Sequence, residues 1–427
     1  MQERVLLVGG GGREHAIARA LSDSELYAYS SNRNPGIAAI ASEIRTGSET
    51  DQGAIVDFAT DIDATLAVIG PEGALAAGVV DALGEAGIYA FGPAAEQARL
   101  ETDKAHQREF MAEHGIEARP DFATFEAVEP AIEYLESVEG DVAVKPRGLT
   151  GGKGVRVTGD QLSKGEAVAY LRESDYGEWV IEERLVGEEF TVQAFVANGE
   201  VRPTLAVQDH KRAYEGDEGP NTGGMGSYSD TGPVLPFMTD ADYEAAVDVL
   251  ERTVAALEDY RGILYGQFML TAEGPKVVEY NVRFGDPEAM NTLPVLETDL
   301  LDVLVAARDG RSLPELSFSG EATVCKYAVP AGYPVDPEAG AKVSVDVDAA
   351  PETELFYASV DEREDGLYTT TSRSFAVLGL GNSIEVAESR AEAALAEVGA
   401  GFHVRHDIGT AELVESRIEH MRSVRGE

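Results

Sequence analysis

The chain has 427 residues, a hydrophobic fraction of 44%, 45 glycines and 18 prolines, which together predict a turn-rich globular protein of about three domains. Its net charge of −43, from 77 acidic and 34 basic residues, excludes a protein whose general surface binds nucleic acid or an anionic membrane. The single cysteine, Cys325, excludes an intramolecular disulfide and a cysteine-based zinc site.

Acidic residues occur in every segment, and lysine is scarce. Such a surface is typical of a protein from a salt-accumulating halophile, where concentrated counterions screen the repulsion; an acidic mesophilic protein is the alternative. The apolar run at residues 4–8 is too short for a signal sequence, and no segment reaches the length of a membrane span. We therefore expect a cytoplasmic protein that binds neither nucleic acid nor membrane.

The first hundred residues alternate between strand and helix patterns. Residues 4–8 read as a buried strand, 9–12 as a tight glycine turn and 13–21 as a helix. A strand at 64–69 and a helix at 75–86 follow, and another strand lies at 88–91. This alternation predicts an open parallel sheet.

The glycine turn resembles a dinucleotide motif but fails on spacing. G-x-G-x-x-G starting at Gly9 or Gly10 requires a glycine where Glu14 or His15 stands. A glycine turn before a helix still offers free backbone N–H groups to an anion, and Arg13 could close on it; simple close packing is the alternative. We expect His15 to make a structural hydrogen bond.

A second glycine-rich loop, residues 148–154, joins strands predicted at 142–146 and 155–157. It is not a P-loop, because the spacing is one residue short and a strand follows the lysine. A loop between two strands can instead fold over phosphates as a flap, although an ordinary hairpin turn would look similar. Lys145 and Lys153 bracket this loop in a lysine-poor chain, which favours a phosphate-binding role.

Three further segments carry polar side chains. The strand predicted at 179–183 ends in two glutamates, which alone is weak evidence for a nucleotide site. Residues 208–212 form a basic cluster, and residues 220–226 form a glycine-rich loop with small polar donors, typical of a substrate-contacting loop. An ordinary surface loop is the alternative for both.

The hairpin predicted from residues 263–270 and 276–282 carries polar side chains that could bind a metal ion and an anion. Alternation along its second strand places Val277, Glu279, Asn281 and Arg283 on one face. Gln267 on the partner strand is expected nearby. Oxygen ligands of this kind suit Mg²⁺ or Mn²⁺, and a guanidinium can stabilise developing negative charge; a solvated polar edge is the alternative. From about residue 321, short strands and a helix at 384–398 predict a compact α+β tail.

Taken in order, these motifs resemble the phosphoribosylamine–glycine ligase family of ATP-grasp enzymes, also called glycinamide ribonucleotide synthetases. The similarity covers nearly the whole chain and is strongest from residue 145 to 288. The flap at residues 148–154 and the pair Glu279 and Asn281 are features that ATP-grasp enzymes share generally. The Pro-Asn-Thr-Gly-Gly-Met-Gly segment at 220–226 and the Arg-Phe-Gly-Asp-Pro-Glu segment at 283–288 are more particular.

The resemblance implies a multidomain α/β and α+β protein. Its expected parts are an N-terminal open parallel α/β domain at 1–102, an ATP-grasp linker and flap subdomain at 103–190, an ATP-grasp catalytic subdomain at 191–322 and a small C-terminal α+β domain at 323–427. The implied reaction joins glycine to 5-phosphoribosylamine with ATP through a glycyl phosphate, in purine biosynthesis. We expect a monomer that uses Mg²⁺ or Mn²⁺.

Roles carried over by position follow from the same resemblance. Arg283 would steady the acyl phosphate and its transition state, and the metal ligands would be Gln267, Glu279 and Asn281. The residues implied to bind ATP are Lys104, Lys145, Gly151, Gly152, Lys153, Gly154, Glu182, Glu183, Leu185 and Glu189. Those implied to contact glycine or phosphoribosylamine are Gly10, Gly11, Gly12, Arg13, Asp209, Lys211, Asn221, Thr222, Gly223, Gly224, Met225, Gly226 and Asp286.

Two departures and three alternatives accompany this reading. Gln267 stands where many ATP-grasp enzymes have a glutamate, and the tail around Ser372 to Phe375 matches the family only loosely. The alternatives are an ATP-grasp ligase with other substrates, a nucleotide-binding regulator on a decayed ligase scaffold, and a nicotinamide dehydrogenase, which the missing glycine disfavours.

Overall fold

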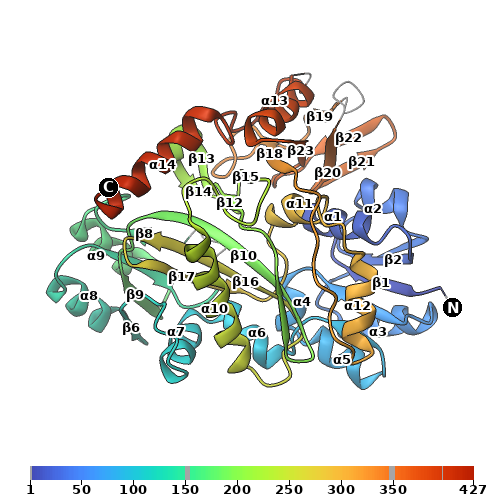
Figure 1. Cartoon of the computed structure of the whole chain (residues 1–427), viewed down its shortest axis with the longest axis horizontal. Coiled ribbons are helices and arrows are strands. Elements are labelled where there is room, and N and C mark those ends of the chain that lie inside the picture. The colour runs from blue at the N-terminus through green and yellow to red at the C-terminus, as the bar shows by residue number, and fades with distance from the viewer. Residues whose placement is uncertain (1, 150–153, 346–351, 397) are drawn as a thin grey trace.

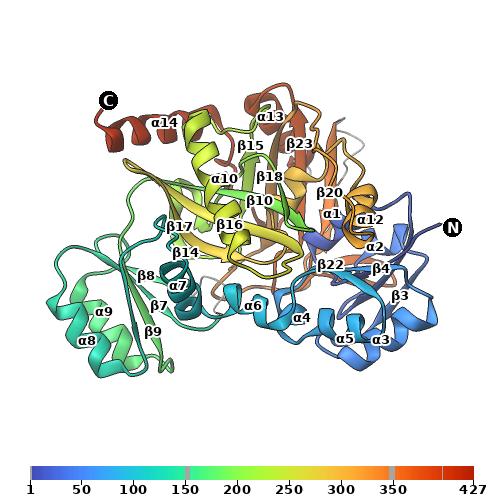
Figure 2. The same ribbon diagram turned by 60° about the horizontal axis from the view of Figure 1, so that its bottom comes forward.

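The computed structural model describes residues 2–149, 154–345, 352–396 and 398–427, and it has the expected mixed α/β architecture. A parallel N-terminal sheet and a small flap subdomain lie at opposite ends of a central antiparallel sheet, and the C-terminal sheet lies beside the central one (Figures 1 and 2). The fold class predicted from the sequence is confirmed.

The N-terminal sheet has five parallel strands in the order β3-β2-β1-β4-β5. The strands are β1 Arg4–Val8, β2 Glu25–Ser30, β3 Glu43–Thr46, β4 Leu66–Ile69 and β5 Tyr89–Phe91. The helices are α1 Gly12–Ala20, α2 Pro35–Ile40, α3 Gln52–Asp61, α4 Glu72–Ala76, α5 Val79–Glu85 and α6 Ala95–Thr102. The single helix predicted at 75–86 is wrong, because Gly78 adopts a left-handed conformation (φ 79°) and separates α4 from α5.

The flap subdomain, residues 122–183, is an antiparallel sheet covered by two helices and reached through α7 Lys104–Glu113. Its elements are β6 Phe122–Phe125, α8 Val128–Ser137, β7 Val142–Pro146, β8 Arg156–Val157, α9 Lys164–Glu173 and β9 Trp179–Glu183. A separate hydrophobic cluster around Trp179, Ile181 and Leu135 fills it. Because this core is its own, the flap subdomain can move as a unit.

The central sheet pairs two long hairpins in the order β11-β10-β16-β17. Its strands are β10 Glu188–Ala197, β11 Glu200–Pro203, β16 Gly262–Thr271 and β17 Gly274–Asn281, and α10 Asp240–Ala255 packs on them. The chain then forms α11 Glu288–Thr292 and α12 Leu300–Arg308. The hairpin predicted from residues 263–270 and 276–282 is therefore present, as β16 and β17.

The C-terminal sheet has the order β12-β15-β18-β23-β20, with β24 also paired to β18. In this region of the molecule, the elements that come before residue 322 in the chain are β12 Gln208–Asp209, β13 Arg212–Tyr214, the 3-10 turn Glu215–Asp217, β14 Glu218–Asn221 and β15 Gly226–Ser229. Those that follow are β18 Ala322–Pro330, β19 Lys342–Val343, β20 Thr353–Tyr357, β21 Val360–Arg363, β22 Gly366–Thr369, β23 Phe375–Gly381, α13 Ile384–Leu395, β24 Phe402–His403 and α14 Ala411–Arg425. One sheet thus crosses the boundary predicted at 322/323.

Two large hydrophobic clusters unite the rest of the molecule. One contains Phe58 of the N-terminal part, Phe268 of the central sheet and Val324 of the C-terminal sheet. The other likewise joins Val5, Phe195 and Leu378. This shared packing makes the N-terminal, central and C-terminal parts one body, against which the flap subdomain is set.

Across the described ranges, no helix combines the length and apolar character needed to cross a membrane.

Candidate active site

A cavity of about 410 Å³ lies where the N-terminal sheet, the flap subdomain, the central sheet and the C-terminal sheet meet. Predicted site residues that line it are Arg13, Lys104, Lys145, Glu189, Asp209, Lys211, Asn221, Thr222, Gly223, Gln267, Glu279, Asn281, Arg283 and Asp286. Lining residues that the sequence reading did not name are Glu72, Glu101, Gln107, Leu149, Val155, Tyr265, Val278, Glu288 and Arg373.

The remaining predicted residues do not line this cavity. They are Gly10, Gly11, Gly12, Gly154, Glu182, Glu183, Leu185, Gly224, Met225 and Gly226. Met225 is fully buried in the hydrophobic core, and the Glu183 carboxylate accepts from Lys276 (Oε1–Nζ 3.0 Å) and from the backbone N–H of Asp121 (3.2 Å). Gly151, Gly152 and Lys153 lie outside the described residues.

A β-bulge in β17 decides which side chains enter the cavity. Gln267 pairs with Glu279 but the next residue, Phe268, pairs with Val277, so Val278 has no partner across the strand. The extra residue shifts the alternation, and Val277 points into the hydrophobic core while Glu279 and Asn281 line the cavity. The prediction that Val277 shares the face of Glu279 is therefore wrong.

A buried ion-pair cluster holds Lys145 at the edge of the cavity. Glu182 accepts from Arg108 (Oε1–Nε 2.6 Å, Oε2–Nη2 3.2 Å) and pairs with Lys145 (Oε2–Nζ 2.6 Å). Arg108 also donates to the carbonyl of Val278 (2.7 Å), which the bulge exposes. Burial alone would raise the pKa of Glu182, but Arg108 and Lys145 outweigh it and lower the pKa to about 2. The carboxylate is thus fixed as an anion, and it fixes Lys145.

A second lysine reaches the cavity from the start of α7. Lys104 donates to the carbonyl of Gly148, at the start of the glycine-rich flap loop (2.7 Å). Burial lowers its pKa, and the nearby Glu279 carboxylate opposes that shift. Lys104 and Lys145 therefore present two ammonium groups beside the flap loop.

The predicted metal ligands lie together on the face of the β16–β17 hairpin that lines the cavity. Gln267, Glu279 and Asn281 all line the cavity, and Lys211 pairs with Glu279 (Nζ–Oε1 3.6 Å) and donates to the Gln267 amide oxygen. Burial would raise the pKa of Glu279, but Lys211, Lys104 and Lys145 lower it to about 2. The described residues hold no group of three or more His, Cys, Asp or Glu suited to a metal, so a cation here would rely on amide oxygens as well as carboxylate.

Arg283 is set by two acids from the N-terminal part. It pairs with buried Glu101 (Nη2–Oε1 2.7 Å) and with Glu72 (Nε–Oε2 3.7 Å), and it donates to Asn281 Oδ1 (3.2 Å). Burial works against the charge of Arg283, but Glu101 and Glu72 raise its pKa above the ordinary value. A permanent positive charge therefore faces the cavity next to the metal-ligand candidates.

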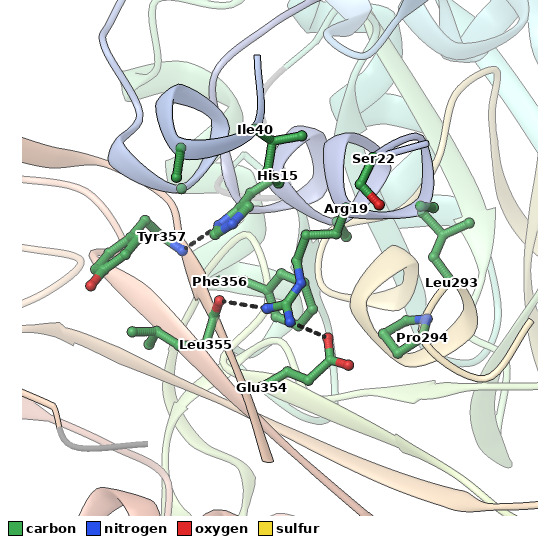
Figure 3. A pocket seen from close by; sticks show the side chains of 14 residues that line it. His15, Arg19, Ser22, Ile40, Leu293, Pro294, Glu354, Leu355, Phe356 and Tyr357 are labelled. Carbon is green, nitrogen blue, oxygen red and sulfur yellow. Dashed lines mark hydrogen bonds and ion pairs between the residues drawn. The ribbon is translucent and has the colours of Figure 1, made fainter. Parts of the chain in front are cut away.

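The glycine turn is anchored to the C-terminal domain. Fully buried Asn34 donates through Nδ2 to the carbonyls of Gly10 (3.0 Å) and Tyr357 (2.7 Å), and its Oδ1 caps α2. His15 accepts from the backbone N–H of Tyr357 (Nδ1–N 2.9 Å), which confirms its predicted structural role; burial lowers its pKa to about 3. Figure 3 shows the contact between His15 and Tyr357, which both line a separate cavity of about 680 Å³.

The C-terminal domain also supplies Arg373, which the sequence reading left unassigned. Arg373 donates to the carbonyls of Gly223 (2.7 Å) and Gly224 (3.0 Å) and pairs with Asp286 (Nη2–Oδ1 3.3 Å). Asp286 also accepts from Tyr327 (Oδ1–Oη 2.7 Å). In the sequence, Arg373 is a single cation among polar residues of the tail that matches the family only loosely. That pattern was too weak to place Arg373 in the cavity.

Other missed acids had a clearer signal. Glu72 follows the carboxyl end of β4, where open parallel sheets gather their ligands, and could have been found. Glu288 directly follows the Asp-Pro pair; it accepts from Tyr265 (Oε1–Oη 2.8 Å). Glu101 lies inside α6 and gave no signal, because only the packing of α6 on β17 brings it to Arg283.

Known proteins resemble this chain over its whole length. Residues 3–101, 102–289 and 323–411 match the N, ATP-grasp (A) and C domains of phosphoribosylglycinamide synthetase. A phosphoribosylamine–glycine ligase of Methanosarcina barkeri is 51% identical over 436 residues, which cover 99% of this chain and 100% of the relative.

Two solved structures extend this comparison. The phosphoribosylamine–glycine ligase of Thermotoga maritima superposes with a TM-score of 0.80 at 28% identity, over 95% of this chain and 99% of that one. A biotin carboxylase of Campylobacter jejuni reaches a TM-score of 0.74 at 14% identity, over 97% and 95%, and so shares the fold alone.

Replacing Glu182 tests the buried cluster. We expect Glu182→Gln to lower the free energy of unfolding by about 3 kcal/mol at neutral pH, because Arg108 and Lys145 lose their counter-charge in a buried place. The pKa of Glu182 is lowered, so its contribution is complete above the unfolded value of about 4.3 and fades as the pH falls toward 2. Urea unfolding of both proteins at a series of pH values measures the difference.

The matched control is Glu117→Gln, which removes a carboxylate that is 85% exposed and pairs loosely with Arg119. It should change stability by less than about 0.5 kcal/mol. Equal effects of the two substitutions would contradict the role given to Glu182.

Proposed function

The chain belongs to the phosphoribosylglycinamide synthetase family, and from that premise we propose that it ligates glycine to 5-phosphoribosylamine with ATP. The products are glycinamide ribonucleotide, ADP and phosphate, a step of purine biosynthesis. The observation that carries the proposal is a single cavity in which Lys104, Lys145, the oxygen donors of the β16–β17 hairpin and Arg283 converge.

ATP would bind between the flap subdomain and the central sheet. Lys104 and Lys145 neutralise phosphate oxygens, and the flap loop with Gly151, Gly152, Lys153 and Gly154 covers them. Glu182, Glu183 and Leu185 would frame adenine and Glu189 the ribose. Because the Glu182 carboxylate is taken up by Arg108 and Lys145, its contribution to adenine would come from its backbone, while its side chain positions the lysine.

A divalent cation fits the donor set. Glu279 remains anionic at any physiological pH, and the amide oxygens of Gln267 and Asn281 are hard donors of the kind that Mg²⁺ and Mn²⁺ prefer. A bound cation supplies charge neutralisation for the phosphates. Gln267, in place of a carboxylate, would weaken one contact or leave it to water.

The residues around this site support transfer through an acyl phosphate. A carboxylate is a poor electrophile, so phosphorylation by ATP makes it reactive, and the amine of phosphoribosylamine then displaces phosphate. Arg283 would hold the transferred phosphoryl group as charge develops on it. Among the described residues that line the cavity there is no serine or cysteine, which agrees with a route that needs no side-chain nucleophile.

The substrate contacts are proposed for the walls opposite the flap. They are the glycine turn with Gly10, Gly11, Gly12 and Arg13, the residues Asp209, Lys211, Asn221 and Thr222, the loop Gly223, Gly224, Met225 and Gly226, and Asp286. Arg373 holds the carbonyls of that loop in place. We propose a monomer as the working unit.

Other readings predict other substrate requirements. The fold shared with a biotin carboxylase shows that ATP-grasp architecture alone does not choose the substrates.

We place the reaction in the cytoplasm, where ATP and the phosphorylated sugar amine are retained by their charge.

Omitting one substrate at a time tests the proposed reaction. We expect ADP release only when ATP, Mg²⁺, glycine and phosphoribosylamine are all present, with glycinamide ribonucleotide formed in equal amount. A coupled ADP assay with mass spectrometry of the product measures both. ADP release that requires a different amine or acid would replace the proposed substrates, and no turnover at all would favour a regulator.

Removing the guanidinium of Arg283 tests its role in the chemistry. We expect Arg283→Ala to lower kcat by at least about 100-fold, because a fixed charge at the transferring group is lost. The fold should persist, since burial already raises the pKa of Glu101 and the acid can take up a proton when its partner is gone. Steady-state kinetics and circular dichroism measure the two effects.

The control is Arg252→Ala, which removes an exposed arginine paired with Asp248 on α10 (Nε–Oδ2 2.8 Å). It should leave kcat and every KM unchanged. Activity of Arg283→Ala near that of the unmodified protein would rule out the proposed role.

Salt dependence tests the proposed halophilic adaptation. We expect Tm to rise as KCl increases from about 0.1 M to about 2 M, because the screening length falls from about 10 Å to about 3 Å or less. Thermal unfolding followed by circular dichroism measures it. A Tm that is independent of salt would favour an acidic mesophilic protein.

A further inference from the structure

One carboxylate oxygen in the active-site cavity, Oδ1 of Asp209, receives no hydrogen bond from the described residues. Seven acids line the cavity: Glu72, Glu101, Glu189, Asp209, Glu279, Asp286 and Glu288. Each of the others pairs with an arginine, a lysine, an amide or a tyrosine hydroxyl of the described chain. The Asp209 Oδ1 atom is buried and accepts no hydrogen bond there.

A buried carboxylate oxygen that accepts no hydrogen bond is costly, so its persistence points to a ligand that donates to it. Burial, and then nearby Glu288, raise the pKa of Asp209 well above its ordinary value, while Lys211 and Arg373 oppose the shift. A bound cation would favour the ionised carboxylate. Of the three proposed substrates, ATP and phosphoribosylamine bring phosphates to the site, and glycine brings an α-ammonium group, which is protonated in the free amino acid at neutral pH.

The surroundings of Asp209 fit a small amino acid. Asp209 and Lys211 both line the cavity while His210 between them is buried behind it. Extended backbone spaces such alternate residues about 6.6 Å apart, enough for a carboxylate and an ammonium group to lie between their side chains. Gly224 lies behind the cavity lining and packs closely against Asp209, since a Cβ there would lie 2.9 Å from Oδ1.

We infer that Asp209 binds the α-ammonium group of glycine, while the glycine carboxylate faces Lys211 and the phosphate end of the cavity. This rests on the proposed ligase function and assigns one end of one substrate. The contact has a chemical consequence: a carboxylate keeps the bound amine protonated, so it cannot act as a nucleophile. The amine of the bound glycine is thereby kept from reacting, and the amine of phosphoribosylamine attacks the acyl phosphate and displaces phosphate.

The test compares Asp209→Asn with the unmodified protein, varying each substrate in turn. We expect the KM for glycine to rise at least about 30-fold, with the KM for ATP and for phosphoribosylamine within about twofold. The free variant should melt at the same temperature or higher, because a buried unpaired charge has been removed. Asp230→Asn, at the end of β15 and away from the cavity, is the matched control and should change none of these values.

Three kinetic results would overturn the assignment. They are an unchanged KM for glycine, a KM that rises for phosphoribosylamine instead, and an equal rise for all three substrates. If the unmodified protein makes no glycinamide ribonucleotide with the complete set, the proposed function itself fails, so the two failures are distinct.

A second measurement does not depend on the variant. With Mg²⁺ and a non-hydrolysable ATP analogue present, glycine should raise the Tm of the unmodified protein, whereas glycolate, which has a hydroxyl in place of the ammonium group, should raise it much less. Equal stabilisation by the two acids would overturn the assignment.

Discussion

Charge balance inside one cavity is the constraint on which this structure depends. A site for triphosphate and acyl phosphate needs several positive charges close together, and they repel one another until substrate arrives. Three of them are held by a carboxylate: Lys145 by Glu182, Arg283 by Glu101 and Lys211 by Glu279. Because these pairs are made before binding, the cations are already oriented, and the reaction does not have to reorganise them. Asp209 stands out against this pattern, because its Oδ1 receives no hydrogen bond from the described residues.

The β-bulge in β17 lets one strand serve both the core and the chemistry. If β17 were regular at Val278, with no bulge, Val277 and Glu279 would share a face, and either an apolar side chain would enter the cavity or a glutamate would enter the core. The bulge also turns a backbone carbonyl toward Arg108, which ties the strand to the Glu182 cluster. The β-bulge thus links the strand that carries Glu279 and Asn281 to the ion-pair cluster that holds Lys145.

Two mechanical units meet at the cavity. The N-terminal, central and C-terminal parts share hydrophobic clusters, and the C-terminal domain holds the glycine turn through Tyr357 and the substrate loop through Arg373. The flap subdomain has its own core around Trp179. Closure of this unit over a rigid body would exclude water from an acyl phosphate without disturbing the opposite wall.

The sequence by itself determined the fold class, the β16–β17 hairpin of the central sheet, the glycine turn and most cavity-lining residues, because strand periodicity, turn chemistry and motif spacing are local properties. It gave no access to Glu101 or Arg373, and it misplaced Val277 and joined α4 to α5. Those features depend on contacts between residues far apart in the chain, such as Glu101 with Arg283 and Arg373 with Gly223. Only the tertiary structure decided them. Packing between elements, and not the order of residues within one element, sets which acid neutralises which cation and where a strand carries a β-bulge.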